Sequence, residues 1–203
     1  MKIICVGRNY KEHIYELKNK IPNEILFFLK PETAITQKKL PFFIPDFSNN
    51  IQYEIELVIK INKTGKHIQE KFAHNYYHEL TVGIDFTARD VQEKLKKNGY
   101  PWEKAKAFDG SAAIGTFIKK ENIDDLNNIN FKLFVNNKKQ QDGNTKNMIY
   151  TIDNIISYIS KYITLKKGDL IFTGTPSGVN KVKINDLLEG YINDNKLISI
   201  KIK

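Results

Sequence analysis

The segment IQYEIELVIKI, residues 51–61, alternates between two faces with a period of two residues. In a run this rich in β-branched side chains, that alternation predicts a β-strand with one face in the core. Glu54 and Glu56 lie on the opposite face with Gln52, Val58 and Lys60, about 7 Å from each other at ~3.3 Å per residue. The apolar face consists of Ile51, Tyr53, Ile55, Leu57, Ile59 and Ile61.

The two glutamates of this strand have two interpretations. Antiparallel sheets commonly expose one polar face to water, which would require no ligand. Two carboxylates this close repel one another unless a cation lies between them, so the pair also fits a metal site. The strand taken alone favours the solvent-facing interpretation.

Residues 80–86, LTVGIDF, predict a second and buried strand. Thr87 and Asp90 are spaced as a capping pair for a helix that runs to about Lys97 and is ended by Gly99. Asp85 therefore lies at a strand end, where an unpaired buried charge is costly. It either caps the helix or has a cationic partner, which includes a metal ion.

The remaining segments predict many strands and few helices. Residues 130–144 indicate a hairpin whose turn contains Asp142-Gly143, and the C-terminal residues predict another strand. Helices are expected over residues 152–163 and after Asn9 as far as Lys18, with Asn9 as the cap. The two prolines of residues 38–47 place that segment in an edge strand or a loop. Without regular βαβ alternation, this pattern predicts an α+β, β-dominated fold.

Composition limits the class of protein. The 203 residues suffice for a single domain, and a 41% hydrophobic content argues against disorder. A net charge of +9 allows nucleic-acid binding, but Arg8 and Arg89 are the only arginines and no dense basic block occurs. We therefore expect a lysine-coated surface without nucleic-acid or membrane partners. The lone Cys5 and the lack of a signal or membrane segment favour a cytoplasmic location.

Two further features contain side chains that could take part in catalysis. His13 and Glu16 are three residues apart on a predicted helix, so the carboxylate can orient the ring as in a general base. An exposed helix with ordinary charges is the simpler interpretation of the same pair. Lys106, in the small-residue context AKAFDGSAA, indicates little by itself because most lysines are solvated.

Seven blocks in order resemble the fumarylacetoacetate hydrolase family, specifically its short single-domain members related to acylpyruvate hydrolases and oxaloacetate decarboxylases. The resemblance extends over nearly the whole chain, and the conjunction of blocks is more specific than any one of them. The blocks are CVGRNYKEH (5–13), FFLKPETA (27–34), YEIELV (53–58), VGIDFTARDVQ (82–92), PWEKAKAFD (101–109), DGNTKNMIY (142–150) and GDLIFTGTPSGV (168–179).

The resemblance implies a mixed β-sandwich roll with a few peripheral helices, formed by residues 1–203 as one catalytic domain and assembled as a homodimer. It implies that Glu54, Glu56 and Asp85 bind Mg²⁺, with Mn²⁺ or Ca²⁺ as substitutes, and that Lys106 holds and polarises the substrate. His13 and Glu16 would form a water-activating dyad on a lid within residues 1–20. Arg8, Gln92 and Thr175 match positions that line the substrate site.

The implied reaction is hydrolysis of C–C bonds in acylpyruvates and other β-diketo acids, or decarboxylation of oxaloacetate, through a metal-stabilised enolate. One alternative is an isomerase or hydratase-like enzyme acting on 2-hydroxy-diene-dioates. A non-catalytic basic binding protein is the alternative from another class. Three departures from the family pattern leave the identity of the substrate open. They are Gln52-Tyr53, where many relatives carry a histidine, the loop GSAAIG, which lacks the proline often found there, and Asn180, where a glycine is common.

Overall fold

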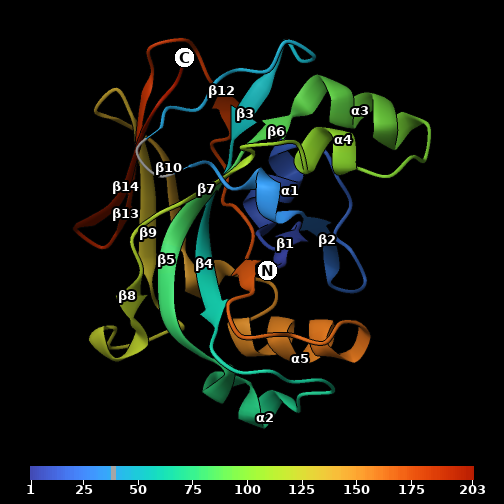
Figure 1. Cartoon of the computed structure of the whole chain (residues 1–203), viewed down its shortest axis with the longest axis vertical. Coiled ribbons are helices and arrows are strands. Elements are labelled where there is room, and N and C mark those ends of the chain that lie inside the picture. Colours follow the sequence, from blue (N-terminus) through green and yellow to red (C-terminus); the bar gives the residue numbers. More distant parts are fainter. Residues whose placement is uncertain (38–39) are drawn as a thin grey trace.

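Short runs rich in isoleucine, valine and phenylalanine form three sheets in the computed structural model, which describes residues 1–37 and 40–203 (Figure 1). The largest sheet has seven strands in the order β2-β1-β11-β4-β5-β7, and β8 also pairs with β5. Its strands are β1 (Ile3–Gly7), β2 (Leu26–Lys30), β4 (Ile55–Ile61), β5 (Tyr77–Asp85), β7 (Ala112–Ile114), β8 (Ile118–Lys119) and β11 (Leu170–Phe172).

Two smaller sheets complete the strand framework. A four-stranded sheet has the order β10-β9-β13-β14, and a three-stranded sheet the order β12-β3-β6. Among the strand pairs of the described residues, β1 and β11 run parallel and the others antiparallel. The strands are β3 (Ile51–Tyr53), β6 (Thr87–Ala88), β9 (Asn130–Val135), β10 (Lys138–Asn144), β12 (Asn180–Lys181), β13 (Leu187–Ile192) and β14 (Asn195–Lys201).

The four-stranded sheet packs face to face against β4 and β5, and the core lies between them. Gly190 of β13 lies so close that an added Cβ would come within 2.9 Å of Ile55 Cδ1 and 3.2 Å of Val82 Cγ2. Phe131 and Leu133 of β9 are fully buried in the same core. The α+β, strand-dominated fold expected from the sequence is therefore confirmed.

The helices lie around this framework (Figure 1). The best formed is α5, in which Thr151 and Asn154 make a reciprocal capping box and Ile155, Ile156 and Ile159 are buried. Of the helices in the described ranges, none is long and apolar enough to cross a membrane. They are α1 (Lys11–Glu16), α2 (Glu70–Ala73), α3 (Arg89–Lys97), α4 (Glu103–Lys106) and α5 (Ile152–Tyr162).

Two capping predictions were wrong. Helix α1 follows Tyr10 without a side-chain cap, because Asn9 instead bonds the backbone of Tyr150 and Thr173. Thr87 belongs to β6 and does not cap α3, although that helix ends where Gly99, with φ +66°, predicted it. Buried polar groups elsewhere in the fold use these side chains, which local spacing does not indicate.

The hairpin prediction was correct in its strands and wrong in its turn. Asn136 and Asn137, at φ +50° and +64°, turn the chain between β9 and β10. Asp142 and Gly143 lie within β10 instead. In the preceding loop region, Lys38 and Lys39 fall outside the described residues, and Phe42 pairs with Ile202 as an isolated bridge.

The strand expected over residues 51–61 is interrupted at Glu54. Its first part, β3, pairs with β6 and β12, whereas β4 lies inside the large sheet between β5 and β11. Both faces of β4 are covered in its first half, since Leu57 on one face and Val58 on the other are fully buried and Glu56 is 2% exposed. The solvent-facing interpretation that the strand alone favoured is therefore wrong. Glu54 marks the point where the chain passes from one sheet to another.

Gln141 of β10 holds this interruption in place. Its Oε1 accepts a hydrogen bond from Ile55 N at 2.9 Å. Its Nε2 donates to Thr175 Oγ1 and to Pro176 O, each at 2.9 Å. A single buried amide therefore ties the break after Glu54 to the loop 173–178.

Replacing Gln141 with leucine should destabilise the protein by about 3 kcal/mol, because three buried polar groups lose their partner. Urea unfolding of Gln141→Leu measures this loss. The matched control is Gln140→Leu, whose half-buried side chain should cost about 0.5 kcal/mol or less. Equal unfolding midpoints for the two variants would contradict the role assigned to Gln141.

Candidate active site

The residues expected at the site converge on one cavity of about 50 Å³ beside α1, α3 and the ends of β4 and β5. Of the expected set, Glu16 alone is not in the cavity wall, and it contacts His13, which is. The wall includes Arg8, His13, Glu54, Glu56, Asp85, Gln92, Lys106 and Thr175, together with Leu17, Asn19, Phe28, Arg89, Lys96 and Trp102.

Three buried carboxylates form the floor of this cavity. Glu54 lies at the break between β3 and β4, Glu56 lies in β4, and Asp85 ends β5. Each offers one oxygen such that all three oxygens lie within 4.8 Å of one another. The pairing of β4 with β5 sets this arrangement, since Asp85 N donates to Glu54 O at 2.9 Å.

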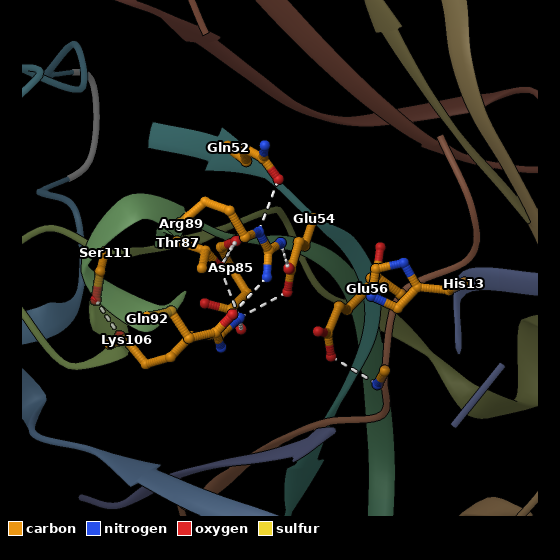
Figure 2. Close-up of polar contacts among 12 residues, drawn as sticks. His13, Gln52, Glu54, Glu56, Asp85, Thr87, Arg89, Gln92, Lys106 and Ser111 are labelled. Carbon is orange, nitrogen blue, oxygen red and sulfur yellow. Dashed lines mark hydrogen bonds and ion pairs between the residues drawn. The ribbon is translucent and has the colours of Figure 1, made fainter. Parts of the chain in front are cut away.

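Cations from three other elements compensate these charges. Lys106 Nζ donates to Glu54 Oε2 and to Asp85 Oδ2, each at 2.7 Å. Figure 2 shows Lys106 beside these two carboxylates. Arg89, at the start of α3, donates to Glu54 Oε1. Lys30 Nζ lies 2.7 Å from Asp85 Oδ1. Burial would raise the pKa of Glu54, but Lys106 and Arg89 outweigh it and hold that pKa well below its usual range.

Glu56 differs from the other two carboxylates. Among the described residues no cation pairs with it, and its Oε2 accepts a hydrogen bond from Gly174 N at 2.6 Å. Burial and the negative charges of Asp85 and Glu54 raise its pKa well above the usual value. A divalent cation between the three carboxylates would remove this repulsion.

The site therefore fits a divalent cation. Asp85 Oδ1 is buried and accepts no hydrogen bond in the described structure. Lys30 Nζ lies 2.7 Å away, but its approach does not have the geometry of a hydrogen bond. Carboxylate oxygens are hard ligands that suit Mg²⁺ or Mn²⁺. Glu54, Glu56 and Asp85 are the residues that would hold the ion.

His13 and Glu16 form the expected pair on α1. His13 Nδ1 lies 3.1 Å from Glu16 Oε2, and Gly178 N donates to Glu16 Oε1 at 3.0 Å. Although burial opposes it, the hydrogen bonds from His13 and Gly178 lower the pKa of Glu16. In Figure 2 the ring of His13 lies on the side of Glu56 away from Lys106. With Nδ1 held by Glu16, Nε2 is the nitrogen that a ligand in the cavity can reach.

The polar wall opposite His13 comes from α3. Arg89 Nη1 donates to Gln92 Oε1 at 2.6 Å, and Arg89 Nε donates to Gln52 Oε1 at 2.8 Å. Arg89 and Gln92, three residues apart, therefore share one face of α3. Both side chains are more than nine-tenths buried, so their orientation is fixed before a ligand binds.

Lys30 is a buried site residue that the motifs left without a role. Its ammonium donates to Lys106 O and to Ser111 O and Oγ, besides pairing with Asp85. It occurs at the end of the apolar run FFLK, directly before Pro31. A lysine closing an apolar strand is the local signal that could have identified it.

The fold and this constellation of buried acids and bases define a family of enzymes. The family model described as "Fumarylacetoacetate (FAA) hydrolase C-terminal" matches residues 2–203. The chain belongs to this family.

Relatives agree over nearly their full lengths. The mitochondrial oxaloacetate tautomerase FAHD1 of Mus musculus is 42% identical over 201 residues, which is 99% of this chain and 91% of the relative. The mitochondrial oxaloacetate decarboxylase of Dictyostelium discoideum is 43% identical over 189 residues, 93% of this chain and 87% of the relative. The crystal structure of fumarylpyruvate hydrolase from Pseudomonas aeruginosa in complex with Mn²⁺ and pyruvate superimposes with a TM-score of 0.92 at 34% identity, covering 100% of this chain and 89% of the other.

Metal affinity should rise with pH. Below its raised pKa, Glu56 is protonated and must lose that proton to become a ligand, so protons compete with the ion. As the pH rises toward that raised pKa, Mn²⁺ binding should tighten by up to about tenfold per pH unit and level off above it. Calorimetric titration in buffers of different ionisation enthalpy measures both the affinity and the released proton; a pH-independent affinity without proton release would contradict the assignment.

Proposed function

We propose that this protein is a divalent-metal-dependent enzyme that forms the enolate of a small 2-oxo acid, with oxaloacetate tautomerisation and decarboxylation as its principal reactions. The observation that carries the proposal is the buried Glu54, Glu56 and Asp85 triad with Lys106 Nζ 2.7 Å from two of its members. Relatives named for these reactions support the choice of substrate.

The chemistry follows from where negative charge develops. Removal of a C3 proton from oxaloacetate, or loss of CO₂ from C3, leaves an enolate whose charge rests on the C2 oxygen. A bound Mg²⁺ or Mn²⁺ would supply Lewis-acid stabilisation of that charge. Burial lowers the pKa of Lys106, but its two carboxylate partners, Asp85 and Glu54, raise that pKa by more. The side chain therefore remains a cationic donor.

His13 and Lys106 have complementary roles in tautomerisation. His13 Nε2 takes the proton from C3, and the electron pair of that C–H bond forms the C2–C3 double bond. Lys106 donates a hydrogen bond to the C2 oxygen as the C=O bond becomes the enolate C–O⁻, and the proton held by His13 then passes to that oxygen, which gives the enol and neutral His13. Glu16 keeps the ring of His13 oriented and stabilises its protonated form.

Hydrolysis of acylpyruvates is the second candidate, and the His13–Glu16 pair favours it. His13 would deprotonate a water that attacks the distal carbonyl, after which the C–C bond breaks and the pyruvate enolate leaves and is protonated. Decarboxylation needs no attacking water, so the two reactions should depend differently on this pair.

Several expectations from the sequence remain predictions. They are Mg²⁺ as the ion used, the homodimer, the lid role of residues 1–20, the single catalytic domain and the cytoplasmic location.

Glu54→Gln and Glu56→Gln should each lower turnover of oxaloacetate by at least about a hundredfold, because a lost carboxylate removes the charge that binds the ion. Glu121→Gln, an exposed site, controls for the chemical change. The readout is enol and pyruvate formation with Mg²⁺, with Mn²⁺ and with EDTA. Full turnover in EDTA, or in both site variants, would overturn the proposal.

His13→Ala should slow acylpyruvate hydrolysis by about a hundredfold and oxaloacetate decarboxylation by less than about threefold, because only hydrolysis requires an activated water. Parallel assays with acetylpyruvate and oxaloacetate measure the ratio. Equal losses would show that His13 does not act through water. Turnover of 2-hydroxy-diene-dioates alone would instead favour the isomerase. Salt-sensitive nucleic-acid binding without turnover would favour the non-catalytic binding protein.

A further inference from the structure

A second polar group lies in the cavity wall in addition to the buried acids. Lys96 Nζ, in the last turn of α3, donates to Asn19 Oδ1 at 2.9 Å. Arg8 Nη2 donates to the same oxygen at 3.2 Å. One amide carbonyl therefore holds an ammonium and a guanidinium side by side, and all three residues belong to the cavity wall.

These two cations lack a carboxylate partner. Among residues 1–37 and 40–203, no Asp or Glu oxygen lies within ion-pair distance of Arg8 or Lys96. Partial burial and the positive charges of Arg8 and Arg89 lower the pKa of Lys96. Like charges held together at a cavity wall favour an anion between them.

The backbone of Arg8 supports a functional reason for this arrangement. Its φ is +59°, in the left-handed region that non-glycine residues rarely adopt. The conformation follows β1 directly and belongs to a residue whose guanidinium also approaches Lys20 O at 3.5 Å. Strain of this kind concentrates at binding sites, where the surrounding structure maintains it.

We propose that Arg8 and Lys96, aligned by Asn19, bind the distal carboxylate of a dicarboxylic 2-oxo acid, which makes Lys96 a specificity-determining residue. The proposal rests on the proposed function, because the 2-oxo acid head must bind at the acidic triad. The head carboxylate would then lie near the divalent cation that the triad would hold. The distal carboxylate would contact Arg8 and Lys96 in another part of the same cavity.

The size of the cavity selects a short chain. Its volume of about 50 Å³ leaves little room beyond a short-chain ligand. The apolar wall from Leu17, Phe28 and Trp102 offers a carboxylate no hydrogen-bond donor apart from the indole N–H. Among the described residues, Arg8 and Lys96 are the cations of this wall without a carboxylate partner, so they distinguish a charged tail from a methyl group.

Unreactive ligands separate binding at this group from turnover. Malate and 2-hydroxybutanoate share the 2-hydroxy acid head and differ in a distal carboxylate against a methyl group. With Mn²⁺ present, calorimetry should find that the wild-type protein prefers malate. Lys96→Met should weaken malate binding about tenfold, as for a lost charge-assisted hydrogen bond, and change 2-hydroxybutanoate less than about twofold. Lys96→Arg should restore the preference.

Lys97→Met is the matched control, since Lys97 is an exposed neighbour in the same helical turn and lies outside the cavity wall. An equal loss for both ligands, an equal effect of Lys97→Met, or no wild-type preference for malate would overturn the proposal. A Lys96-dependent preference for malate without oxaloacetate turnover would instead overturn the proposed function and leave the carboxylate subsite standing. If the protein turns over oxaloacetate but Lys96→Met leaves the preference for malate unchanged, the carboxylate subsite is overturned and the proposed function stands.

Discussion

Lys106 Nζ, which lies 2.7 Å from both Glu54 and Asp85, is the contact on which the geometry of the site depends. The two carboxylates come from a strand break and from the end of β5, and both are almost completely buried. Removing one member of a buried ion pair typically costs about 3–5 kcal/mol, because the remaining charge has no compensation. Helix α4 is one turn long, and this contact fixes its place against the sheet. The acids and their cations therefore fold as a unit.

The interruption at Glu54 places two carboxylates of one segment, Glu54 and Glu56, at the cavity. The peptide of Glu54 pairs with Asp85, but the next amide, that of Ile55, bonds to the side chain of Gln141. The chain can then leave the small sheet and enter the large one without an unpaired buried amide. The oxygens of Glu54 and Glu56 converge with that of Asp85 within 4.8 Å.

Periodicity and the family motifs were sufficient to predict the strand-rich fold, helix α5 and the residues that meet at the cavity. They did not predict the break at Glu54, because its hydrogen-bond partner Gln141 is distant in sequence and only the sheet packing brings it close. Local propensity also favoured Asp142-Gly143 as the turn, whereas the register of β9 with β10 selects Asn136-Asn137. Lys30 and Lys96 were missed for a related reason. In a chain whose basic residues are nearly all lysines, sequence does not distinguish a buried or site-lining ammonium from a solvated one.

Charge balance connects the two groups of residues in the cavity. The buried carboxylates of Glu54, Glu56 and Asp85 formally balance Lys30, Lys106 and Arg89. A divalent cation bound there would add an excess of two positive charges in a region of low dielectric. A 2-oxo acid with an uncharged tail would compensate one of these charges, and a dicarboxylate would compensate both. Lys96 is largely exposed, so solvent screening limits its own share of the attraction. The buried excess therefore favours dianions in general, while Arg8 and Lys96 select those whose second carboxylate reaches the cavity wall that they form.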